Sequence, residues 1–462
     1  MTTDPGADGA APAVPAGVVR AFRDGRRGPA PPPGAGVAET VRAPGPAAVP
    51  AQRDLVLDAA RTGCLLVVVL VHLLMVTVTA DPGTGGPATV MVPTQQPWYW
   101  WATWILQVMP LFFVLGGHAS VLSWRRHTAH GGDAAGWVRA RALRLLRPAA
   151  VLWAVLALGC GAALAAGAPP ELVRTVVQGM GMPLWFLAAY LACQALLPLT
   201  AGWHGRAPGA TAAGLLAAVV AVDALRIGTG AAWVGLLNLV LVWPLVQQLG
   251  FLRADGWFER RRPAQLLAGG GLCFALLAGL VATGRYAPDM LANLNPATVC
   301  MVLLGVAQAC LLQLAAPALG ALMRTRPARL AAWAVGGRAM TVYLWHLPVI
   351  VAVAAVWFLA GGPDPQPGSA AWWAWRVPLG AVVAVVLAVV SVPLVRAERR
   401  PVALPPGDRE PAAPVVVLAV LLGFLPPFLQ ISWWLSPVLA LAGAVLTAVA
   451  VALLRRGRPA AR

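Results

Sequence analysis

Long apolar segments recur along the chain and are separated by short polar stretches. Each segment holds about twenty residues with few charges, which is the length that an α-helix needs to cross the hydrocarbon core of a bilayer. The pattern therefore predicts an all-α, polytopic membrane protein. We count about twelve such spans, near residues 59–80, 100–123, 148–167, 183–201, 209–227, 230–250, 264–283, 296–316, 337–360, 372–395, 413–429 and 433–454.

The distribution of arginine gives an independent check of this count, because loops rich in positive charge stay on the cytoplasmic side of a membrane. The predicted loops are alternately rich and poor in arginine along the whole chain: loop 124–147 holds six and loop 81–99 holds none. Tryptophans cluster at 98–104 and 372–375, at the ends of the spans opposite to the arginine-rich loops, as expected for interfacial belts. We therefore expect a multi-pass protein of the cell membrane with both termini in the cytoplasm.

Composition supports the same class and excludes others. Hydrophobic residues make up 59% of the chain and charged residues 11%, whereas soluble domains carry about 25% charged residues. The formal net charge of +17 comes from arginines in short loops, where they face anionic lipid headgroups, so we expect a lipid bilayer and no nucleic acid as partner. No H-x-x-x-H or H-E-x-x-H pattern is present, so we expect no metal site. The oligomeric state stays open.

The chain divides into five parts by composition. Residues 1–52 are rich in Pro, Ala, Gly and Arg and contain no apolar segment, so we expect a disordered cytoplasmic tail. Residues 53–395 hold about ten spans and form the main transmembrane domain. A cytoplasmic loop, 396–412, leads to two additional spans in 413–454, and a basic cytoplasmic tail, 455–462, ends the chain.

The first span carries three ionisable residues at helical spacing. Arg61 stands where the apolar run begins, and His72 stands eleven positions later inside the run. Eleven residues are about three turns, so the two side chains lie within roughly 20° of one face and roughly 16 Å apart along the axis. Asp58 precedes Arg61 by three residues, within side-chain reach. An ionisable residue at membrane depth indicates a functional site, although a histidine that only joins two helices is the alternative.

Two further spans place histidines at similar depth, each with arginine toward the cytoplasm. His118 lies in the second span, after Gly116 and Gly117, and His346 lies in the ninth, two turns beyond Arg338. Arginines at the inner surface bind phosphates, so an acyl-CoA co-substrate is expected there, with its acyl end toward a mid-membrane histidine. That histidine is predicted to be the general base for an acceptor hydroxyl. The two glycines permit close approach of either a ligand or a neighbouring helix.

A transporter or flippase for a cell-envelope precursor is the alternative function. Such proteins hold substrates at broken helices and relay protons through buried acids. The main acid within a predicted span is Asp223, and Arg226, three residues later, is placed to neutralise it. The glycine and proline breaks do not fall at matching places in two halves, so the enzyme is the preferred interpretation.

Five segments, in order, resemble motifs of the acyltransferase-3 family of integral membrane acyltransferases. The segments are L-D-A-A-R-T-G-C-L-L-V-V-V-L-V-H with Asp58, Arg61 and His72; P-L-F-F-V-L-G-G-H-A-S; R-A-L-R-L-L-R-P with Arg144 and Arg147; P-L-W-F-L with Trp185; and V-Y-L-W-H-L-P with Tyr343 and His346.

The resemblance implies a helical domain of about ten spans that transfers an acyl group, often acetyl, from cytoplasmic acyl-CoA to a hydroxyl of a carbohydrate, lipid or glycosylated metabolite. His72 matches the family's essential histidine and Arg61 the arginine paired with it, and no cofactor is implied. The candidates for binding substrate are Asp58, His118, Arg144, Arg147, Trp185, Tyr343, His346 and Arg338. Gly117 and His118 depart from the family pattern, and the two spans after residue 412 exceed its core.

Overall fold

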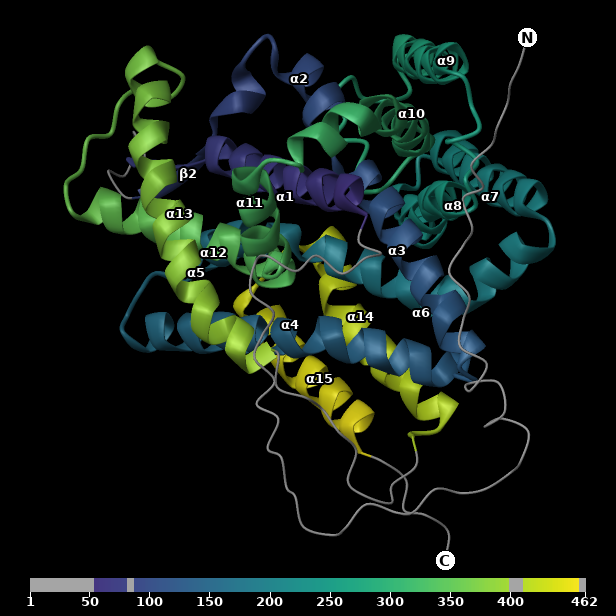
Figure 1. Cartoon of the computed structure of the whole chain (residues 1–462). Helices are drawn as coiled ribbons and strands as arrows, with labels where there is room; N and C mark the ends of the chain where they lie inside the picture. Colours follow the sequence, from purple (N-terminus) through teal and green to yellow (C-terminus); the bar gives the residue numbers. More distant parts are fainter. Residues whose placement is uncertain (1–53, 81–86, 399–409, 457–462) are drawn as a thin grey trace, which may run out of the picture. The chain divides into compact units, whose positions relative to one another are not determined.

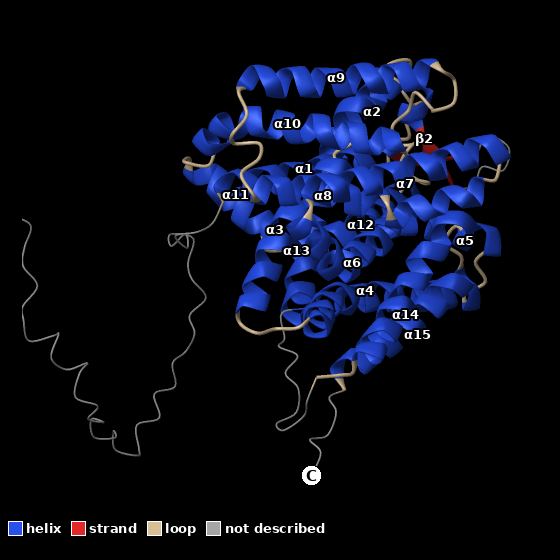
Figure 2. Cartoon of the chain, turned by 90° about the vertical axis from the view of Figure 1, so that its right-hand side faces the viewer, coloured by secondary structure: helices blue, strands red, loops and turns tan. Residues whose placement is uncertain are grey.

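The computed structural model describes residues 54–80, 87–398 and 410–456 (Figure 1). The predicted tail 1–52 lies outside the described residues, as do most of the predicted loop 396–412 and of the predicted tail 455–462. In the described part, α-helices make up nearly all of the chain, and a single β-ribbon accompanies them (Figure 2). Twelve helical stretches there are long and apolar enough to cross a membrane, so the predicted polytopic α-helical protein is confirmed.

The helices follow one another along the chain and differ mainly in length. They are α1 (Leu55–Met75), α2 (Tyr99–Leu106), α3 (Met109–Ala129), α4 (Ala134–Ala165), α5 (Pro170–Gly181), α6 (Trp185–Arg206), α7 (Pro208–Thr229), α8 (Val242–Ala254), α9 (Pro263–Ala282), α10 (Val299–Leu322), α11 (Arg326–Gly336), α12 (Ala339–Leu359), α13 (Ala370–Glu398), α14 (Ala413–Trp433) and α15 (Pro437–Arg455), with 3-10 turns η1 (Val92–Gln95), η2 (Met182–Leu184) and η3 (Ala232–Val240).

The first helix is shorter than its apolar run. α1 begins at an N-cap, where Asp54 Oδ1 accepts hydrogen bonds from the backbone N–H groups of Val56 and Leu57 at 2.9 and 3.1 Å. It ends at Met75, because the next residues are the β-branched V-T-V-T, which favour an extended backbone. Strand β1 (Val76–Ala80) then pairs antiparallel with β2 (Pro87–Met91).

The helices on the arginine side are longer than predicted. The sequence predicts a loop at 124–147, but α3 continues to Ala129 and α4 begins at Ala134. The prediction was wrong because apolar length measures only the hydrocarbon core, whereas arginine is a good helix former and extends a helix beyond the core. The N-cap of α4 is Asp133, whose Oδ1 accepts from Gly136 N–H at 2.8 Å.

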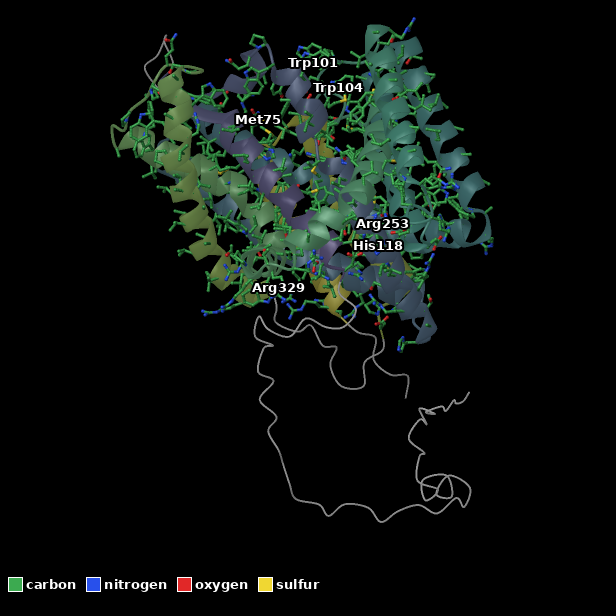
Figure 3. All side chains as sticks on the ribbon, turned by 45° about the horizontal axis from the view of Figure 1, so that its top comes forward. Met75, Trp101, Trp104, His118, Arg253 and Arg329 are labelled. Carbon is green, nitrogen blue, oxygen red and sulfur yellow. The ribbon has the colours of Figure 1, made fainter. Side chains whose placement is uncertain are left out.

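The two ends of the bundle differ in composition, and we name them accordingly. Figure 3 shows Trp101 and Trp104 toward one end, the tryptophan-rich end, and Arg329 toward the other, the arginine-rich end. α1 runs between these ends and packs against α3, α10, α11 and α12. Residues of α1 can therefore face the interior of the bundle rather than lipid.

A polar cluster joins three helices at the arginine-rich end. His204, in the last turn of α6, is buried, and its Nε2 lies 2.9 Å from Asp255 Oδ2, while Arg125 Nη2 of α3 donates to Asp255 Oδ1 at 2.7 Å. Burial raises the pKa of the Asp255 carboxyl, but the hydrogen bonds from His204 and Arg125 outweigh that effect and hold this pKa below its ordinary value. The cluster therefore fixes the ends of α3, α6 and α8 relative to one another.

Close approach of two backbones joins α3 to α8. A Cβ atom at Gly250 would lie 2.2 Å from the carbonyl oxygen of Val114 and 2.5 Å from the backbone nitrogen of His118. A Cβ at Gly117 would lie 2.5 Å from the carbonyl oxygen of Gln247. Helix contact therefore explains Gly117, as small residues permit in membranes.

We predict that Gly250→Ala destabilises the protein by about 1–3 kcal/mol, because both obstructing atoms belong to backbone and the helices must separate. The measurement is thermal unfolding of the purified protein in detergent. Gly214→Ala in α7 is the matched control, because a Cβ there meets nothing within 4 Å. Equal melting temperatures for the two variants would contradict the close packing of α3 on α8.

Candidate active site

Two histidines from distant parts of the chain meet in the bundle. His72 of α1 and His346 of α12 have ring centroids 4.9 Å apart, and His346 Nε2 lies 3.2 Å from His72 Nδ1. His72 Nδ1 also lies 2.8 Å from the carbonyl oxygen of Val68. A carbonyl can only accept a hydrogen bond, so His72 Nδ1 carries the hydrogen and Nε2 keeps its lone pair. The arrangement leaves an imidazole nitrogen that can take up a proton.

The second histidine is held in a fixed orientation. His346 is fully buried, and its Nδ1–H donates to the carbonyl of Tyr343 at 2.7 Å and lies 3.2 Å from that of Val342. His346 Nε2 is therefore an acceptor and shares the Nδ1 hydrogen of His72 with the Val68 carbonyl. This pairing fixes the tautomer of His72, in the way that a third group orients a catalytic base.

His72 lines a cavity of about 390 Å³ toward the tryptophan-rich end, which we call the His72 cavity. Its wall combines α1 with Trp185 of α6, Tyr343 of α12 and polar residues from other elements. Those polar residues are Thr94, Tyr99, Gln107, Asp289, Asn295 and Gln430.

A second cavity, which we call the arginine cavity, has a volume of about 220 Å³. It lies toward the arginine-rich end and is lined by Arg61, Arg141 and Arg144. Arg61 Nη1 lies 3.9 Å from Asp58 Oδ1, so the predicted contact between these two residues is present. Gly116 lines this cavity too, and a Cβ there would lie 3.0 Å from the Tyr190 ring. Gly116 thus borders a cavity, whereas Gly117 borders a helix.

A wider surface hollow, of about 650 Å³, continues from the arginines. The hollow shares Arg141 and Arg144 with the arginine cavity. Its wall also includes Arg126, His127 and His130, which do not line the arginine cavity. The guanidinium of Arg141 stacks 4.3 Å above the Trp137 ring. Guanidinium groups bind phosphate oxygens in pairs of hydrogen bonds, so these residues suit a polyphosphate ligand.

Tyr343 lines both the arginine cavity and the His72 cavity. Its hydroxyl donates to the carbonyl of Pro183, and its own carbonyl receives the hydrogen of His346 Nδ1. The residue therefore contacts both cavities and the histidine pair at once.

The other predicted site residues are placed as follows. Trp185 lies in the wall of the His72 cavity and Arg144 in that of the arginine cavity, whereas neither cavity is lined by Arg147, Arg338 or His118. Arg338 occupies the N-cap position of α12, and its Nη1 donates to Ser391 Oγ at 3.3 Å. His118 adjoins Gly250 of α8, and Figure 3 shows it near Arg253.

Several polar residues that the sequence does not single out line the cavities of the structure, among them Arg141, Gln107, Gln430 and Arg376. Arg141 opens the R-A-L-R-L-L-R-P segment without being singled out there, and Gln107 is a neutral residue inside the predicted span 100–123, at the break between α2 and α3. Arg376, in the apolar run of α13, is 8% exposed; it stacks 3.9 Å over Trp372 and donates to the carbonyl of Val76 at 3.3 Å. An arginine inside an apolar run was the signal available for Arg376.

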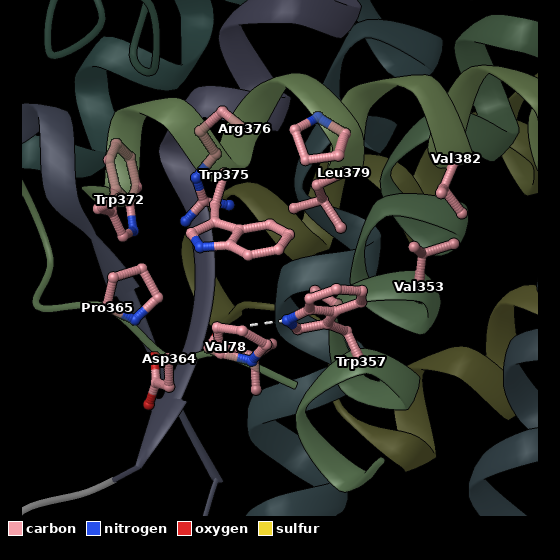
Figure 4. A pocket seen from close by; sticks show the side chains of 13 residues that line it. Val78, Val353, Trp357, Asp364, Pro365, Trp372, Trp375, Arg376, Leu379 and Val382 are labelled. Carbon is pink, nitrogen blue, oxygen red and sulfur yellow. Dashed lines mark hydrogen bonds between the residues drawn. The ribbon is translucent and has the colours of Figure 1, made fainter. Parts of the chain in front are cut away.

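Arg376 borders a small aromatic cavity of about 90 Å³ beside the β-ribbon (Figure 4). Trp372 and Trp375 of α13 face Trp357 of α12 across it, and Trp357 Nε1 donates to the carbonyl of Pro363 at 3.2 Å. Neither His72 nor His346 lines this cavity. Its tryptophans suit the interfacial belt that the sequence predicts.

The chain matches a known protein family over most of its length. A family model described as an acyltransferase domain matches residues 54–395, which include α1 to α13 up to Val395. No curated protein and no solved structure matches the chain. Among the described residues, no group of three or more His, Cys, Asp or Glu side chains is placed to hold a metal ion.

Proposed function

The chain belongs to the acyltransferase-3 family of membrane acyltransferases, and we propose that it transfers an acyl group, acetyl in the first instance, from acyl-CoA to a hydroxyl. The acceptor is a carbohydrate, a lipid or a glycosylated metabolite. The single observation that carries this proposal is the position of Tyr343, which borders the arginine cavity, the His72 cavity and the histidine pair.

The donor enters at the arginine-rich end in this proposal. The phosphates of acyl-CoA bind in the surface hollow at Arg141 and Arg144, and Arg61 lies farther inward along the same route. The pantetheine arm then runs toward Tyr343 and brings the thioester to His72. Positively charged loops mark the cytoplasmic side, so this end faces the cytoplasm, where acyl-CoA is made, and both termini lie there.

His72 is the general base of the transfer. Its Nε2 takes the proton of the acceptor hydroxyl while the oxygen attacks the thioester carbonyl carbon. The C–S bond breaks, the new ester forms, and the CoA thiolate takes the proton back from His72 as CoA–SH. His346 supports the charged intermediate state, because its Nε2 lone pair accepts the Nδ1 hydrogen of His72.

Asp223, the buried acid that would suit a transporter, is held by hydrogen bonds to neighbouring elements instead. Asp223 is 1% exposed, and its carboxylate accepts hydrogen bonds from Asn238 Nδ2 at 3.0 Å, Tyr286 Oη at 3.2 Å and Val299 N–H at 2.9 Å. Arg226 Nε lies 4.0 Å from it. A carboxylate occupied in this way joins α7 to η3 and α10 and is not placed to relay protons.

The proposed function is tested with the purified full-length protein in detergent. Radiolabelled acetyl-CoA is supplied together with a cell-envelope extract, and both label in the extract and free CoA thiol are measured. We expect thioester-dependent labelling with one CoA released per acyl group transferred. Absence of transfer across a series of acyl-CoA chain lengths, together with counterflow of a solute in proteoliposomes, would assign the chain to the carriers.

A further inference from the structure

The two C-terminal helices lie beyond the region that the family model matches, yet they pack closely on the core. α14 and α15 contact α4, α6 and α5. A Cβ at Gly443 would lie 2.4 Å from the Trp153 ring, and a Cβ at Gly423 would lie 2.5 Å from the Leu146 side chain. Arg139 Nε of α4 also donates to the carbonyl of Leu454 at 2.8 Å. The hairpin is therefore an integral part of the described bundle (Figure 1).

The turn of this hairpin reaches the His72 cavity. Gln430, Ile431 and Trp434 line that cavity together with His72. Trp434 has a φ of 57°, and among the described residues other than glycine it is the one with positive φ. Side chains rarely adopt this backbone conformation, and such strain tends to be kept at functional sites.

The cavity wall holds buried polar atoms that lack partners in the described part of the chain. These atoms are Gln430 Oε1, Gln107 Nε2 and Asn295 Oδ1, and the Gln430 and Gln107 residues are 6% and 4% exposed. Buried polar atoms are normally hydrogen-bonded, so three exceptions around one cavity indicate a ligand.

The orientation of both glutamine amides follows from their backbone neighbours. Gln430 Nε2 donates to the carbonyl of Gly181 at 2.5 Å, which leaves Oε1 as a free acceptor. Gln107 Oε1 accepts from Met109 N–H at 3.2 Å, which leaves Nε2 as a free donor. With Asn295 Oδ1, residues of the cavity wall thus hold two acceptors and one donor without a partner in the described part of the chain.

We propose that the α14–α15 hairpin forms one wall of the acceptor site and that Gln430 Oε1 accepts a hydrogen bond from a hydroxyl of an uncharged, polyhydroxylated acceptor. This inference rests on the proposed acyl transfer. Hydroxyl groups both donate and accept, so several of them match the mixed set of free amide atoms. The described residues that line the cavity include Asp289 and no arginine, so an anionic group on the acceptor has no cationic partner there.

The test compares n-octyl β-D-glucoside with 1-octanol as acceptors for the full-length protein, with acetyl-CoA as donor. We expect the glucoside to be acetylated with the higher kcat/KM, and Gln430→Met to reduce that preference roughly tenfold, the effect of one lost hydrogen bond. The KM for acetyl-CoA should change less than twofold. If Gln430 only supported the structure, its loss would disturb the donor KM as well as the acceptor preference.

Adjacent tryptophans supply a second variant with its own control. Trp434→Leu should also raise the KM for the glucoside, whereas Trp433→Leu should not, because Trp433 is 71% exposed and does not line the cavity. These variants decide the matter if Gln430→Met does not fold.

The results distinguish a failure of the proposed role of the hairpin from a failure of the proposed acyl transfer. Transfer to a cell-envelope extract but not to the glucoside, an unchanged preference in Gln430→Met, or equal effects of the two tryptophan variants would overturn the role of the hairpin. Absence of transfer to every acceptor would overturn the proposed function itself.

Discussion

Replacement of His72 by glutamine lowers kcat for acyl transfer by roughly 10²–10⁴-fold, the range expected when a positioned general base is lost. The amide can occupy a similar volume beside Val68 and His346, but it cannot take a proton from the acceptor hydroxyl. Because the change is confined to the ring, the KM for acyl-CoA should stay within a few-fold of its original value. The measurement is steady-state kinetics of CoA release and product formation.

Leu70→Ala on the same helix is the matched control for His72→Gln. Leu70 is 51% exposed in the described structure and lines neither cavity, so its variant should keep full activity. Size-exclusion profiles and melting temperatures of both variants should match those of the original protein. Full activity in a correctly folded His72→Gln variant would remove His72 from the chemistry.

Replacement of Arg61 by alanine raises the KM for acyl-CoA roughly tenfold or more, because a hydrogen bond to a charged group contributes about 1.5–3 kcal/mol. Arg61→Lys should recover only part of the loss, since an ammonium group does not reproduce the paired hydrogen bonds of a guanidinium. The measurement is the dependence of the initial rate on acyl-CoA concentration. The acceptor KM should be unaffected.

Arg329→Ala serves as the control for Arg61→Ala. Arg329 lies at the same end of the bundle but lines none of the cavities described above (Figure 3). The Arg329→Ala substitution removes the same charge from the arginine-rich end, so a general electrostatic effect would appear in both variants. Equal donor KM values for Arg61→Ala and Arg329→Ala would assign Arg61 a structural role alone.

Much of the fold could be predicted from local pattern, because membrane spans are set by length and apolarity. The number of spans follows from the hydrophobic runs and the alternation of arginine. Helix ends were less predictable: α1 stops at Met75 inside its apolar run, and α4 begins fourteen residues before the predicted start at 148. The end of α1 depends on the β-branched residues within its apolar run, and the start of α4 depends on helix-forming residues that precede its apolar run.

The candidate site could be predicted only in part. The sequence placed His72 and His346 at similar depth, but their contact joins residues 274 positions apart and depends on how α1 packs against α12. Gln107 and Gln430 carried no signal, because a neutral amide next to an apolar run is common and only the tertiary structure shows which of its atoms lack a partner. The helices that bring Gln430 to His72 also lie outside the family motifs.

The most direct measurement is a structure of the full-length protein bound to a non-hydrolysable acyl-CoA analogue. We predict that the nucleotide phosphates contact Arg141 and Arg144 and that the acyl carbonyl lies in the His72 cavity, beside Tyr343. A hydroxyl oxygen must then have room within about 3 Å of His72 Nε2. An analogue bound at another face, or an acyl group separated from His72 by intact helices, would contradict it.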